Sequence, residues 1–314
     1  MFQPESLRIK ELLPFNLLVP GLREAFITGA HVPLRHTHHI EVAGGVGTSL
    51  LMPAWTDEGF YGVKIVNIFP ANRNEGLPGL HSTYVLYSAR TGEPLAILDG
   101  DEITSRRTAA AAALGASFLA RKDASRLLIA GAGRVGSLIA PAMAAVREIR
   151  QVDIWDINPE AAQRCVRTLL DQGFQAKVVD DLASAVRSAD IVSCATLAEE
   201  PFVQASWLSP GSHLDLIGSF TPQMTEAEPA CFTGASLWID TMEAVGKSGD
   251  LLNAFKSGAF NASDVAGTLE ALCRGQCRVR ESDEQRTIFK AVGTALEDLA
   301  AATLIYRRLV AEAE

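Results

Sequence analysis

The stretch Leu127-Leu-Ile-Ala-Gly131-Ala-Gly133-Arg-Val-Gly136-Ser-Leu-Ile-Ala140 joins an apolar run to spaced glycines and then to helix-forming residues. This order predicts a β-strand, a phosphate-binding turn and an α-helix, with an ordinary tight turn as the alternative. The first glycine of such a turn permits the bend, the second lets a pyrophosphate reach the backbone, and the third lets helix and strand pack closely. A phosphate would lie at the positive end of the helix, where backbone N–H groups are free. We therefore predict a dinucleotide site at Gly131, Gly133, Arg134, Val135 and Gly136.

An acidic residue, Asp156, ends the next predicted strand, 151–155, about twenty residues after the glycine turn. A carboxylate at this place accepts hydrogen bonds from the adenosine ribose hydroxyls and repels a 2′-phosphate. Asp156 therefore favours NAD(H), whereas the basic Arg164 nearby keeps NADP(H) open. The alternative role, an N-cap for the following helix, suits Asn158 better.

Strands and helices alternate after the glycine turn. This alternation requires crossover connections, and it predicts an α/β fold with a Rossmann-type, doubly wound parallel sheet. The expected strands lie at 151–155, 176–179, 190–195, 212–217 and 236–239, and the expected helices at 159–171 and 182–188. Thr196 and Gly218 follow two of these strands, whose carboxyl ends face the crevice where a nicotinamide binds. For Thr196 a simple turn hydroxyl is an equal alternative.

The region before residue 100 shows a different pattern. Alternating apolar residues, broken by glycine and proline turns such as Gly44-Gly45, predict strands with short connections and hence a mostly antiparallel sheet. Ahead of these strands, residues 5–27 predict short helical pieces that Pro14 and Pro20 interrupt. The expected strands lie at 36–42, 49–55, 61–68, 82–87 and 94–98.

Two further segments carry helical patterns. The small residues of 102–120 predict a helix that bridges two domains. Apolar residues at helical spacing in 283–313 predict one long helix that returns to the first domain. A length of 314 residues also favours two domains. We expect the first domain at 1–115 together with 290–314, and the dinucleotide-binding domain at 116–289.

Composition is that of an ordinary globular protein, with 48% hydrophobic and 21% charged residues. The formal net charge of −9 argues against a nucleic-acid partner, because no basic stripe exists to neutralise phosphates. Five dispersed cysteines do not indicate a disulfide framework, and neither they nor His36, His38 and His39 form a metal-ligand pattern. Without a secretory signal or an apolar run of about 18 residues, we expect a cytoplasmic protein with no membrane partner.

Three cations lie in or beside apolar sequence. Lys64 interrupts a β-rich run, Arg107 directly precedes the alanine run, and Arg35 precedes the first expected strand. For Lys64 a solvated strand face is an equal alternative. Cations that converge in one cleft bind a carboxylate, because arginine offers a planar two-pronged donor and lysine a mobile point charge. Burial lowers the pKa of a lysine, which would suit Lys64 to acid–base work.

Four segments, taken in order, resemble the ornithine cyclodeaminase and mu-crystallin family over nearly the whole chain. They are Gly62-Val-Lys64-Ile-Val-Asn, Gly92-Glu-Pro-Leu-Ala-Ile-Leu-Asp-Gly with Thr104-Ser-Arg-Arg107-Thr-Ala-Ala, Gly131-Ala-Gly133, and Val292-Gly-Thr-Ala-Leu-Glu-Asp298-Leu. The resemblance implies a homodimer whose first domain, with the last helix, carries the dimer contact and the substrate. By matching motifs, it assigns the substrate carboxylate to Arg35, Lys64 and Arg107, and the dinucleotide to Ser82, Gly133, Arg134, Asp156, Thr196 and Gly218.

Two positions depart from the cyclodeaminases of this family. Those enzymes carry an aspartate in the crevice loop, where this sequence has Phe220, and a serine before the last helix, where it has Ala291. An apolar ring cannot accept a proton, so deamination loses its base. The loop Ile217-Gly-Ser-Phe-Thr-Pro222 instead resembles the family's reductases of cyclic ketimines, Δ1-pyrroline-2-carboxylate and Δ1-piperideine-2-carboxylate, whose products are L-proline and L-pipecolate.

The resemblance therefore implies hydride transfer from a nicotinamide to a protonated cyclic imino acid, whose carboxylate is held by Arg35, Lys64 and Arg107. Three alternatives stay open: an ornithine cyclodeaminase, an alanine dehydrogenase of the same family, and a non-catalytic, NAD(P)H-dependent ligand-binding protein like mu-crystallin. Ketimine reductases of the family often use NADPH, whereas the charge of Asp156 favours NADH.

Overall fold

The computed structural model describes residues 1–42 and 45–314, and the chain forms two compact units. One unit comprises Met1–Arg107 and Thr294–Glu314, and the other comprises Thr108–Gly293. From the sequence, the two boundaries between these units are expected after residue 115 and before residue 290. The turn expected at Gly44-Gly45 begins outside the described residues.

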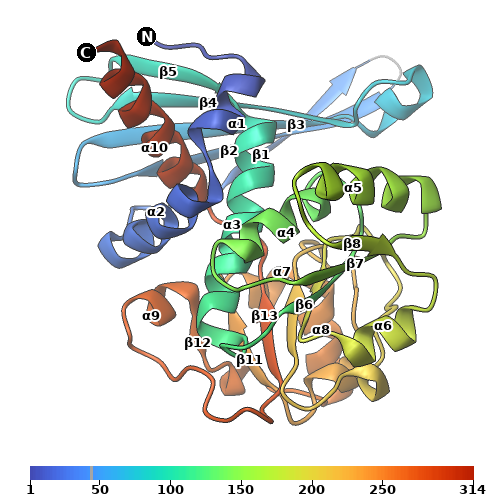
Figure 1. The fold of residues 1–314 in the computed structure, drawn as a ribbon. Coiled ribbons are helices and arrows are strands. Elements are labelled where there is room, and N and C mark those ends of the chain that lie inside the picture. Colours follow the sequence, from blue (N-terminus) through green and yellow to red (C-terminus); the bar gives the residue numbers. More distant parts are fainter. Residues whose placement is uncertain (43–44) are drawn as a thin grey trace. The chain divides into compact units, whose positions relative to one another are not determined.

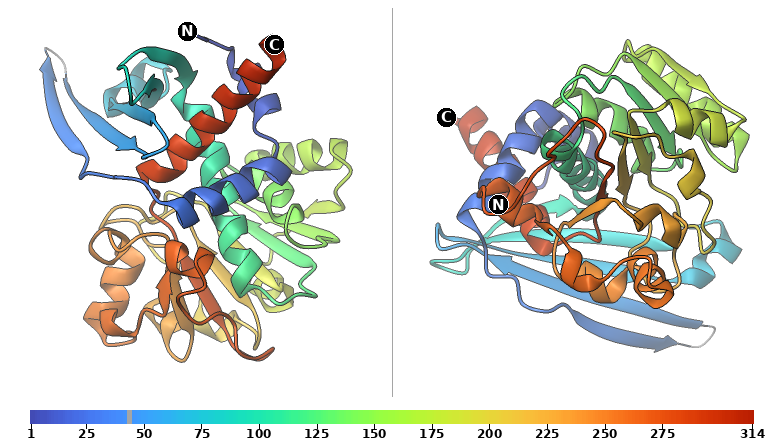
Figure 2. Two further views of the ribbon diagram at one scale, coloured as in Figure 1. Left: turned by 90° about the vertical axis from the view of Figure 1, so that its left-hand side faces the viewer. Right: turned by 90° about the horizontal axis from the view of Figure 1, so that it is seen from below.

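The first unit is built on a five-stranded antiparallel sheet in the order β1-β2-β3-β4-β5. Its helices α2 and α10 pack against each other, and α10 also contacts β2, β3, β4 and β5 (Figures 1 and 2). The antiparallel expectation is confirmed. The bounds are α1 Ser6–Leu12, α2 Phe15–Thr28, β1 His36–Val42, β2 Gly45–Trp55, β3 Phe60–Ile68, η1 Pro70–Glu75, β4 Leu80–Ser88, β5 Pro94–Asp99 and α10 Ala295–Ala313.

Proline acts differently at its two positions in this region. Pro14 immediately precedes α2, which agrees with the expected interruption. Pro20 lies inside α2, so the second expected interruption is wrong. Because Leu18, Leu22 and Phe26 are buried along this helix, their packing offsets the backbone hydrogen bond that proline cannot donate.

The second unit is built on an eight-stranded parallel sheet in the order β12-β11-β13-β10-β9-β6-β7-β8. Its run β8-β7-β6-β9-β10 corresponds to strands 3-2-1-4-5 of the Rossmann order, which confirms the doubly wound prediction. The bounds are α3 Gly100–Leu119, which begins in the first unit, β6 Arg126–Ala130, α4 Gly136–Ala144, β7 Gln151–Trp155, α5 Pro159–Asp171, β8 Ala176–Val178, α6 Leu182–Ser188, β9 Ile191–Cys194, η2 Ala205–Trp207, β10 His213–Leu216, η3 Pro229–Phe232, β11 Ser236–Ile239, α7 Ala244–Lys247, α8 Gly249–Ser257, η4 Ala262–Asp264, β12 Gly267–Thr268, α9 Leu269–Cys273 and β13 Thr287–Lys290.

Both faces of this sheet are buried. Leu128 and Ala130 of β6 belong to an apolar cluster that also contains residues of α6 and α8. Their neighbours Leu127 and Ile129 point to the opposite face, because side chains alternate along a strand, and they are buried too. The near-continuous apolar sequence of β6 follows from this double burial.

The expectation of one long helix over 283–313 is wrong in its first part. Thr287–Lys290 forms β13, a strand between β10 and β11, and helix α10 begins only at Ala295. Gly293 breaks the pattern with a φ of 81°, which an L-residue with a side chain rarely adopts. The four residues of β13 are all buried, and so short a segment shows neither a strand nor a helix period. The helical spacing of the residues that follow therefore led to a predicted helix that starts too early.

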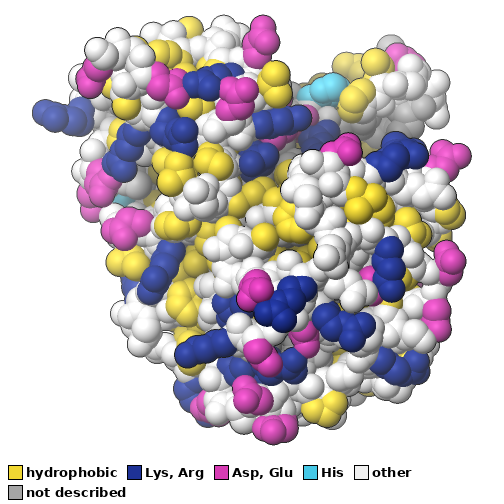
Figure 3. Space-filling model, viewed as in Figure 1, with side chains coloured by type: hydrophobic (Ala, Val, Ile, Leu, Met, Phe, Trp, Pro, Cys, Tyr) yellow, Lys and Arg dark blue, Asp and Glu magenta, His cyan; other side chains and the backbone are white. Residues whose placement is uncertain are grey.

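Charges are mixed on the face drawn in Figure 3, where acidic and basic side chains alternate over the surface. Within residues 1–42 and 45–314, no helix combines the length and the apolar character needed to cross a bilayer. The same residues hold no group of three or more potential metal ligands. All five cysteines are free thiols in the structure, and four are buried.

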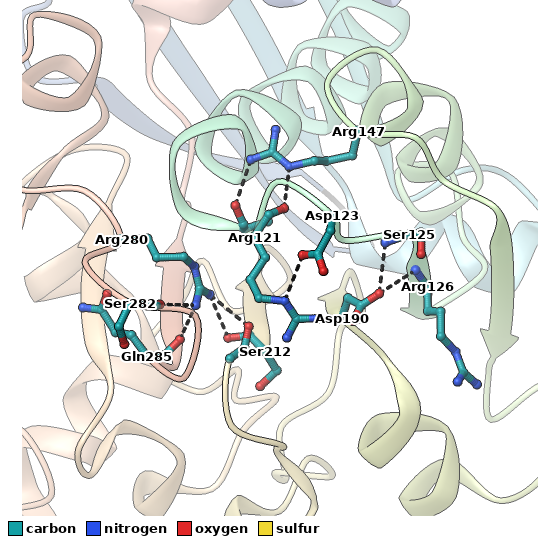
Figure 4. Close-up of polar contacts among 12 residues, drawn as sticks. Arg121, Asp123, Ser125, Arg126, Arg147, Asp190, Ser212, Arg280, Ser282 and Gln285 are labelled. Atoms are coloured by element: carbon teal, nitrogen blue, oxygen red, sulfur yellow. Dashed lines mark hydrogen bonds and ion pairs between the residues drawn. The ribbon is translucent and has the colours of Figure 1, made fainter.

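Arginine side chains hold the carboxyl-terminal end of α3 within the second unit. Figure 4 shows these two cations, Arg147 beside Arg121 and Arg280 beside Ser282 and Gln285. Arg147 donates from Nη2 to the carbonyls of Ala116, Ser117 and Ala120 at 2.8–3.0 Å. Arg280 donates from Nε to the carbonyl of Leu119 at 2.6 Å. Carbonyls at a helix end have no partner within the helix and carry a partial negative charge, so both cations stabilise this end of α3.

Replacement of Arg147 by alanine is expected to lower the free energy of unfolding by about 2 kcal/mol, because it removes a charged donor from several buried carbonyls. Arg126 is the matched control, since its side chain is exposed and extends away from the cluster in Figure 4. Arg126→Ala should change the stability by no more than about 0.5 kcal/mol. Urea unfolding of both variants measures the difference, and equal effects would contradict the anchoring role of Arg147.

Candidate active site

The glycine turn follows β6, as predicted. Gly131 has a φ of 102°, and a Cβ at this position would lie only 2.6 Å from the carbonyl oxygen of Ala195. A Cβ on Gly136 would overlap the carbonyl oxygen of Gly131. The first and third glycines are therefore required by the protein's own packing, which joins the turns after β6 and β9.

The second glycine has no such requirement. A Cβ on Gly133 would meet no atom within 4 Å, and the residue is exposed. Helix α4 begins three residues later, and its N-cap residue Val135 makes no side-chain capping bond. An open approach to the backbone beside an uncapped helix end is a cradle of the kind that receives a pyrophosphate. The residues present therefore fit a dinucleotide.

Asp156 follows β7 and contacts the glycine turn directly. Its Oδ2 atom accepts a hydrogen bond from the Ala132 N–H at 2.6 Å, and Oδ1 accepts from the Asn158 N–H at 2.7 Å. Asn158 caps α5 by accepting from the Glu160 N–H at 3.0 Å, which confirms that this role falls to Asn158. Each Asp156 oxygen keeps a second lone pair for a further donor.

The carboxyl ends of β9 and β10 are tied together by a buried carboxylate. Glu226 Oε1 accepts from the N–H of Thr196 at 2.7 Å and from its hydroxyl at 2.8 Å. Glu226 Oε2 accepts from the Gly218 N–H at 2.7 Å. Because β9 and β10 are parallel neighbours, Thr196 and Gly218 lie at the same edge of the sheet, as predicted. The Thr196 hydroxyl also accepts from the Ala198 N–H at 3.3 Å, so it has the contact of a turn hydroxyl in addition to its bond to Glu226.

The loop after β10 contains Phe220, one of the two positions that depart from the cyclodeaminase pattern. Phe220 is 46% exposed, whereas Ser219 before it is buried. Ser219 Oγ accepts from the Asp250 N–H at 3.1 Å and donates to the Met224 carbonyl. The serine thus shapes the loop, and the ring of Phe220 stands at its surface.

A buried cluster of four charged side chains lies within the first unit. Lys64 of β3 is 2% exposed, so the solvated-strand alternative for it is wrong. Its Nζ lies 2.7 Å from Asp298 Oδ2 and donates to Thr104 Oγ1 at 3.2 Å. Arg107, which lies inside α3, donates to Asp298 Oδ1 at 2.9 Å and to Glu297 Oε2 at 2.7 Å. The two cations are therefore fixed side by side by two acids of α10.

Burial lowers the pKa of Lys64 to about 8, against the opposing charge of Asp298 and with further lowering by Arg107. Burial acts against the charge of Arg107 as well, but Asp298 and Glu297 outweigh it and raise the pKa of this arginine. For Asp298 burial opposes ionisation, yet the neighbouring Arg107 and Lys64 lower the pKa of its carboxyl. The arrangement gives a lysine that exchanges protons near neutral pH beside a permanent cation.

Two other predicted residues lie in the same unit. Arg35 is half-buried immediately ahead of β1, and Ser82 of β4 donates to Asp101 Oδ1 at 2.6 Å. Tyr84, which the sequence did not single out, is buried near this cluster. The charge of Asp298 adds to burial in raising the pKa of its phenol well above the usual value, which keeps the hydroxyl protonated.

Several site residues escaped the sequence analysis. Glu297 and Asp298 form an acid pair between apolar residues in the first turns of α10, and Lys290 ends the apolar run of β13. Charges inside apolar stretches are the signal that would have found them, because unpaired charges are rarely buried. Glu226 offers no such signal, since acidic residues are common in surface loops.

A Rossmann sheet with an open phosphate cradle, together with a unit that buries two cations, defines a dinucleotide-dependent protein that acts on a small anionic ligand. Residues 5–313 match the family described as the ornithine cyclodeaminase/mu-crystallin family. The chain belongs to this family.

Within and beside this family, the chain is similar to proteins whose activities are named. The chain is 37% identical to the Δ1-pyrroline-2-carboxylate reductase of Paracoccus denitrificans, over 90% of each chain. Its fold matches the Δ1-pyrroline-2-carboxylate reductase of Thermococcus litoralis in complex with NADH and L-proline, with a TM-score of 0.92, 30% identity, and coverage of 100% and 98% of the two chains. It also matches an archaeal alanine dehydrogenase dimer with bound NAD, with a TM-score of 0.89, 29% identity, and coverage of 100% and 97%.

Proposed function

We propose that this protein is an NAD(P)H-dependent reductase that converts a cyclic ketimine carboxylate, Δ1-pyrroline-2-carboxylate or Δ1-piperideine-2-carboxylate, to L-proline or L-pipecolate. The observation that carries the proposal is the buried pair Lys64 and Arg107 in a chain that also has the open cradle at Gly133. The Paracoccus and Thermococcus reductases described above support the choice of substrate. Phe220, an apolar residue in the crevice loop, supports reduction over deamination.

Charge balance explains how the substrate is held. Lys64 and Arg107 are neutralised by Glu297 and Asp298, so this cluster alone is electrically balanced. We propose Arg35, which lies ahead of β1 in the same unit, as a third residue that binds the substrate carboxylate, as the family resemblance implies. Arg107 uses two of its five N–H groups on the two acids, and its planar form suits the remainder to a carboxylate.

Lys64 is the group that keeps the imine protonated. A pKa of about 8 leaves its ammonium form in excess at neutral pH and still allows the proton to move. A protonated imine carries positive charge and accepts a hydride more readily than the neutral form. The nicotinamide, when bound, supplies that hydride.

Initial rates test the proposal directly. The purified protein should oxidise NADH or NADPH with one or both cyclic ketimines, and the product should be the L-amino acid. L-Ornithine with catalytic NAD, and pyruvate with ammonia, are the two controls for a cyclodeaminase and for an alanine dehydrogenase. Faster turnover with either control than with both ketimines would overturn the proposal. Cofactor binding without any turnover would instead identify a ligand-binding protein.

We propose NADH as the preferred cofactor because of the charge of Asp156. Asp156→Asn keeps an acceptor for the Ala132 N–H and removes the charge that repels a 2′-phosphate. The ratio of kcat/KM for NADPH to that for NADH is expected to rise by about tenfold or more. Asp171→Asn, at an exposed position at the end of α5, should leave the ratio unchanged. An unchanged ratio in Asp156→Asn would remove Asp156 from cofactor choice.

We propose a reducing, cytoplasmic compartment for this protein, because such a compartment suits its free cysteines. We also propose a homodimer formed by the first unit. The archaeal alanine dehydrogenase above is a dimer, and the β1–β2 hairpin of this chain exposes apolar side chains. Val46 is 58% exposed, so Val46→Asp should shift the mass in light scattering from twice the chain mass toward the monomer. Leu170→Asp, at a position of α5 that is 51% exposed, should leave the mass unchanged. A monomeric unmodified protein would contradict the proposal.

A further inference from the structure

The carboxylate of Glu226 lies beneath the edge of the sheet where β9 and β10 end. The residue is fully buried, and its two oxygens receive two backbone N–H groups and one hydroxyl. Two of the donors belong to Thr196 and one to Gly218. A Cβ on Gly218 would collide with both the Thr196 carbonyl oxygen and the Glu226 side chain, so the three residues form one tight joint.

A second layer of contacts fixes Glu226 itself. Asp250, in the first turn of α8, accepts from the N–H of Glu226 at 2.7 Å and from the N–H of Ala227 at 3.1 Å. Lys290 Nζ donates to the other oxygen of Asp250 at 3.4 Å. Asp250 and Lys290 are both fully buried. The joint is therefore held from α8 and β13 and does not depend on solvent-exposed contacts.

We infer that Glu226 is a positioning residue that sets Thr196 and Gly218 in the geometry that receives the nicotinamide end of the dinucleotide. The inference rests on the proposed function in so far as that function requires a nicotinamide cofactor. Glu226 is buried beneath the two residues and acts through them. Its loss should weaken the nicotinamide contact and leave the phosphate cradle at Gly133 intact.

The ionised carboxylate accepts most strongly from all three donors. A protonated carboxyl has one O–H that must point at a neighbour, and its hydroxyl oxygen is a weaker acceptor, so the N–H facing it is held less firmly. Burial raises the pKa of Glu226 to about 7, opposed by Lys290 and increased by Asp250. The other titratable groups that act on it are Asp215 of β10 and Cys194 of β9. NADH affinity should therefore fall as the pH drops below 7.

Direct binding of two probes separates positioning from general damage. NADH contains the nicotinamide, whereas ADP-ribose ends at the second ribose and occupies only the phosphate cradle and the adenosine site. Glu226→Gln has one acceptor oxygen, and its amide donor must face either Thr196 or Gly218. The variant should bind NADH about ten- to a hundredfold more weakly and bind ADP-ribose as the unmodified protein does.

Asp215→Asn is the matched control, because Asp215 is equally buried but bonds to Ser193 one residue before the strand end. At a pH well above 7, where Glu226 is ionised whatever the charge at position 215, this control should leave the NADH affinity unchanged. Equal losses for NADH and ADP-ribose in Glu226→Gln, or no loss for either, would overturn the inference. If the variant does not fold, the NADH affinity of the unmodified protein is measured as a function of pH. An affinity that does not change around pH 7 would also overturn the inference. Neither measurement uses a ketimine. The inference about Glu226 can therefore fail while the proposed reaction stands, and the proposed reaction can fail while the inference stands.

Discussion

Lys64→Ala is expected to lower kcat/KM for the cyclic ketimine by about 10²- to 10⁴-fold while NADH still binds. The variant removes the proton donor, and it also changes the charge of the cluster. Lys64 and Arg107 balance Glu297 and Asp298, so loss of one cation leaves a net negative cluster that repels a carboxylate. Both effects act on the substrate, and neither acts on the dinucleotide.

The measurement combines initial rates with NADH titration of the same samples. Lys10→Ala is the matched control, because Lys10 lies in the same unit with a side chain 52% exposed. Near-normal turnover of Lys64→Ala would exclude Lys64 from the reaction. Loss of NADH binding together with turnover would indicate a damaged fold.

The pH profile of the unmodified enzyme offers an independent check of the same residue. Lys64 is protonated below its pKa of about 8 and loses its charge above it. The value of kcat/KM should therefore decrease as the pH rises through about 8, and it should be steady just below that value. Lys64→Arg keeps a charge over the whole range, so its residual activity should lack this decrease.

Much of the fold could be predicted because its signals are local. The turn at 131–136 needs glycines for its own bends, and strand β6 before it is apolar from Leu127 to Ala130. Strand β13 could not be predicted in the same way. Its four residues fit a slot between β10 and β11, and that slot is created by segments about fifty and seventy residues away in the chain.

In the candidate site, too, residues with a local signal could be predicted, and residues whose role depends on distant partners could not. Lys64 could be found because a charge in an apolar strand is unusual, but its partner Asp298 lies on a helix at the other end of the chain. Glu226 could not be found, since the meaning of Thr225-Glu-Ala-Glu228 depends on the burial of the loop. Residue type indicated chemistry, whereas the pairing of charges required the tertiary structure.

Two glycines of the turn, Gly136 and Gly133, are expected to respond differently to alanine. Gly136→Ala places a methyl group on the Gly131 carbonyl oxygen, and backbone atoms cannot move aside cheaply. We expect a loss of about 3 kcal/mol or more in the free energy of unfolding, measured by urea titration. A stability within about 0.5 kcal/mol of the unmodified protein would contradict the close packing of β6 and α4.

Gly133→Ala should show the opposite behaviour. Its methyl group meets no protein atom within 4 Å and the backbone has no positive φ, so the fold should keep its stability. The space it fills is the approach of the pyrophosphate, and NADH affinity should fall by about ten- to a hundredfold. Gly246→Ala is the control, because a Cβ there also meets nothing within 4 Å. If Gly133→Ala binds NADH normally, the dinucleotide does not approach the turn at this glycine, because an alanine methyl is tolerated only where no ligand atom must lie.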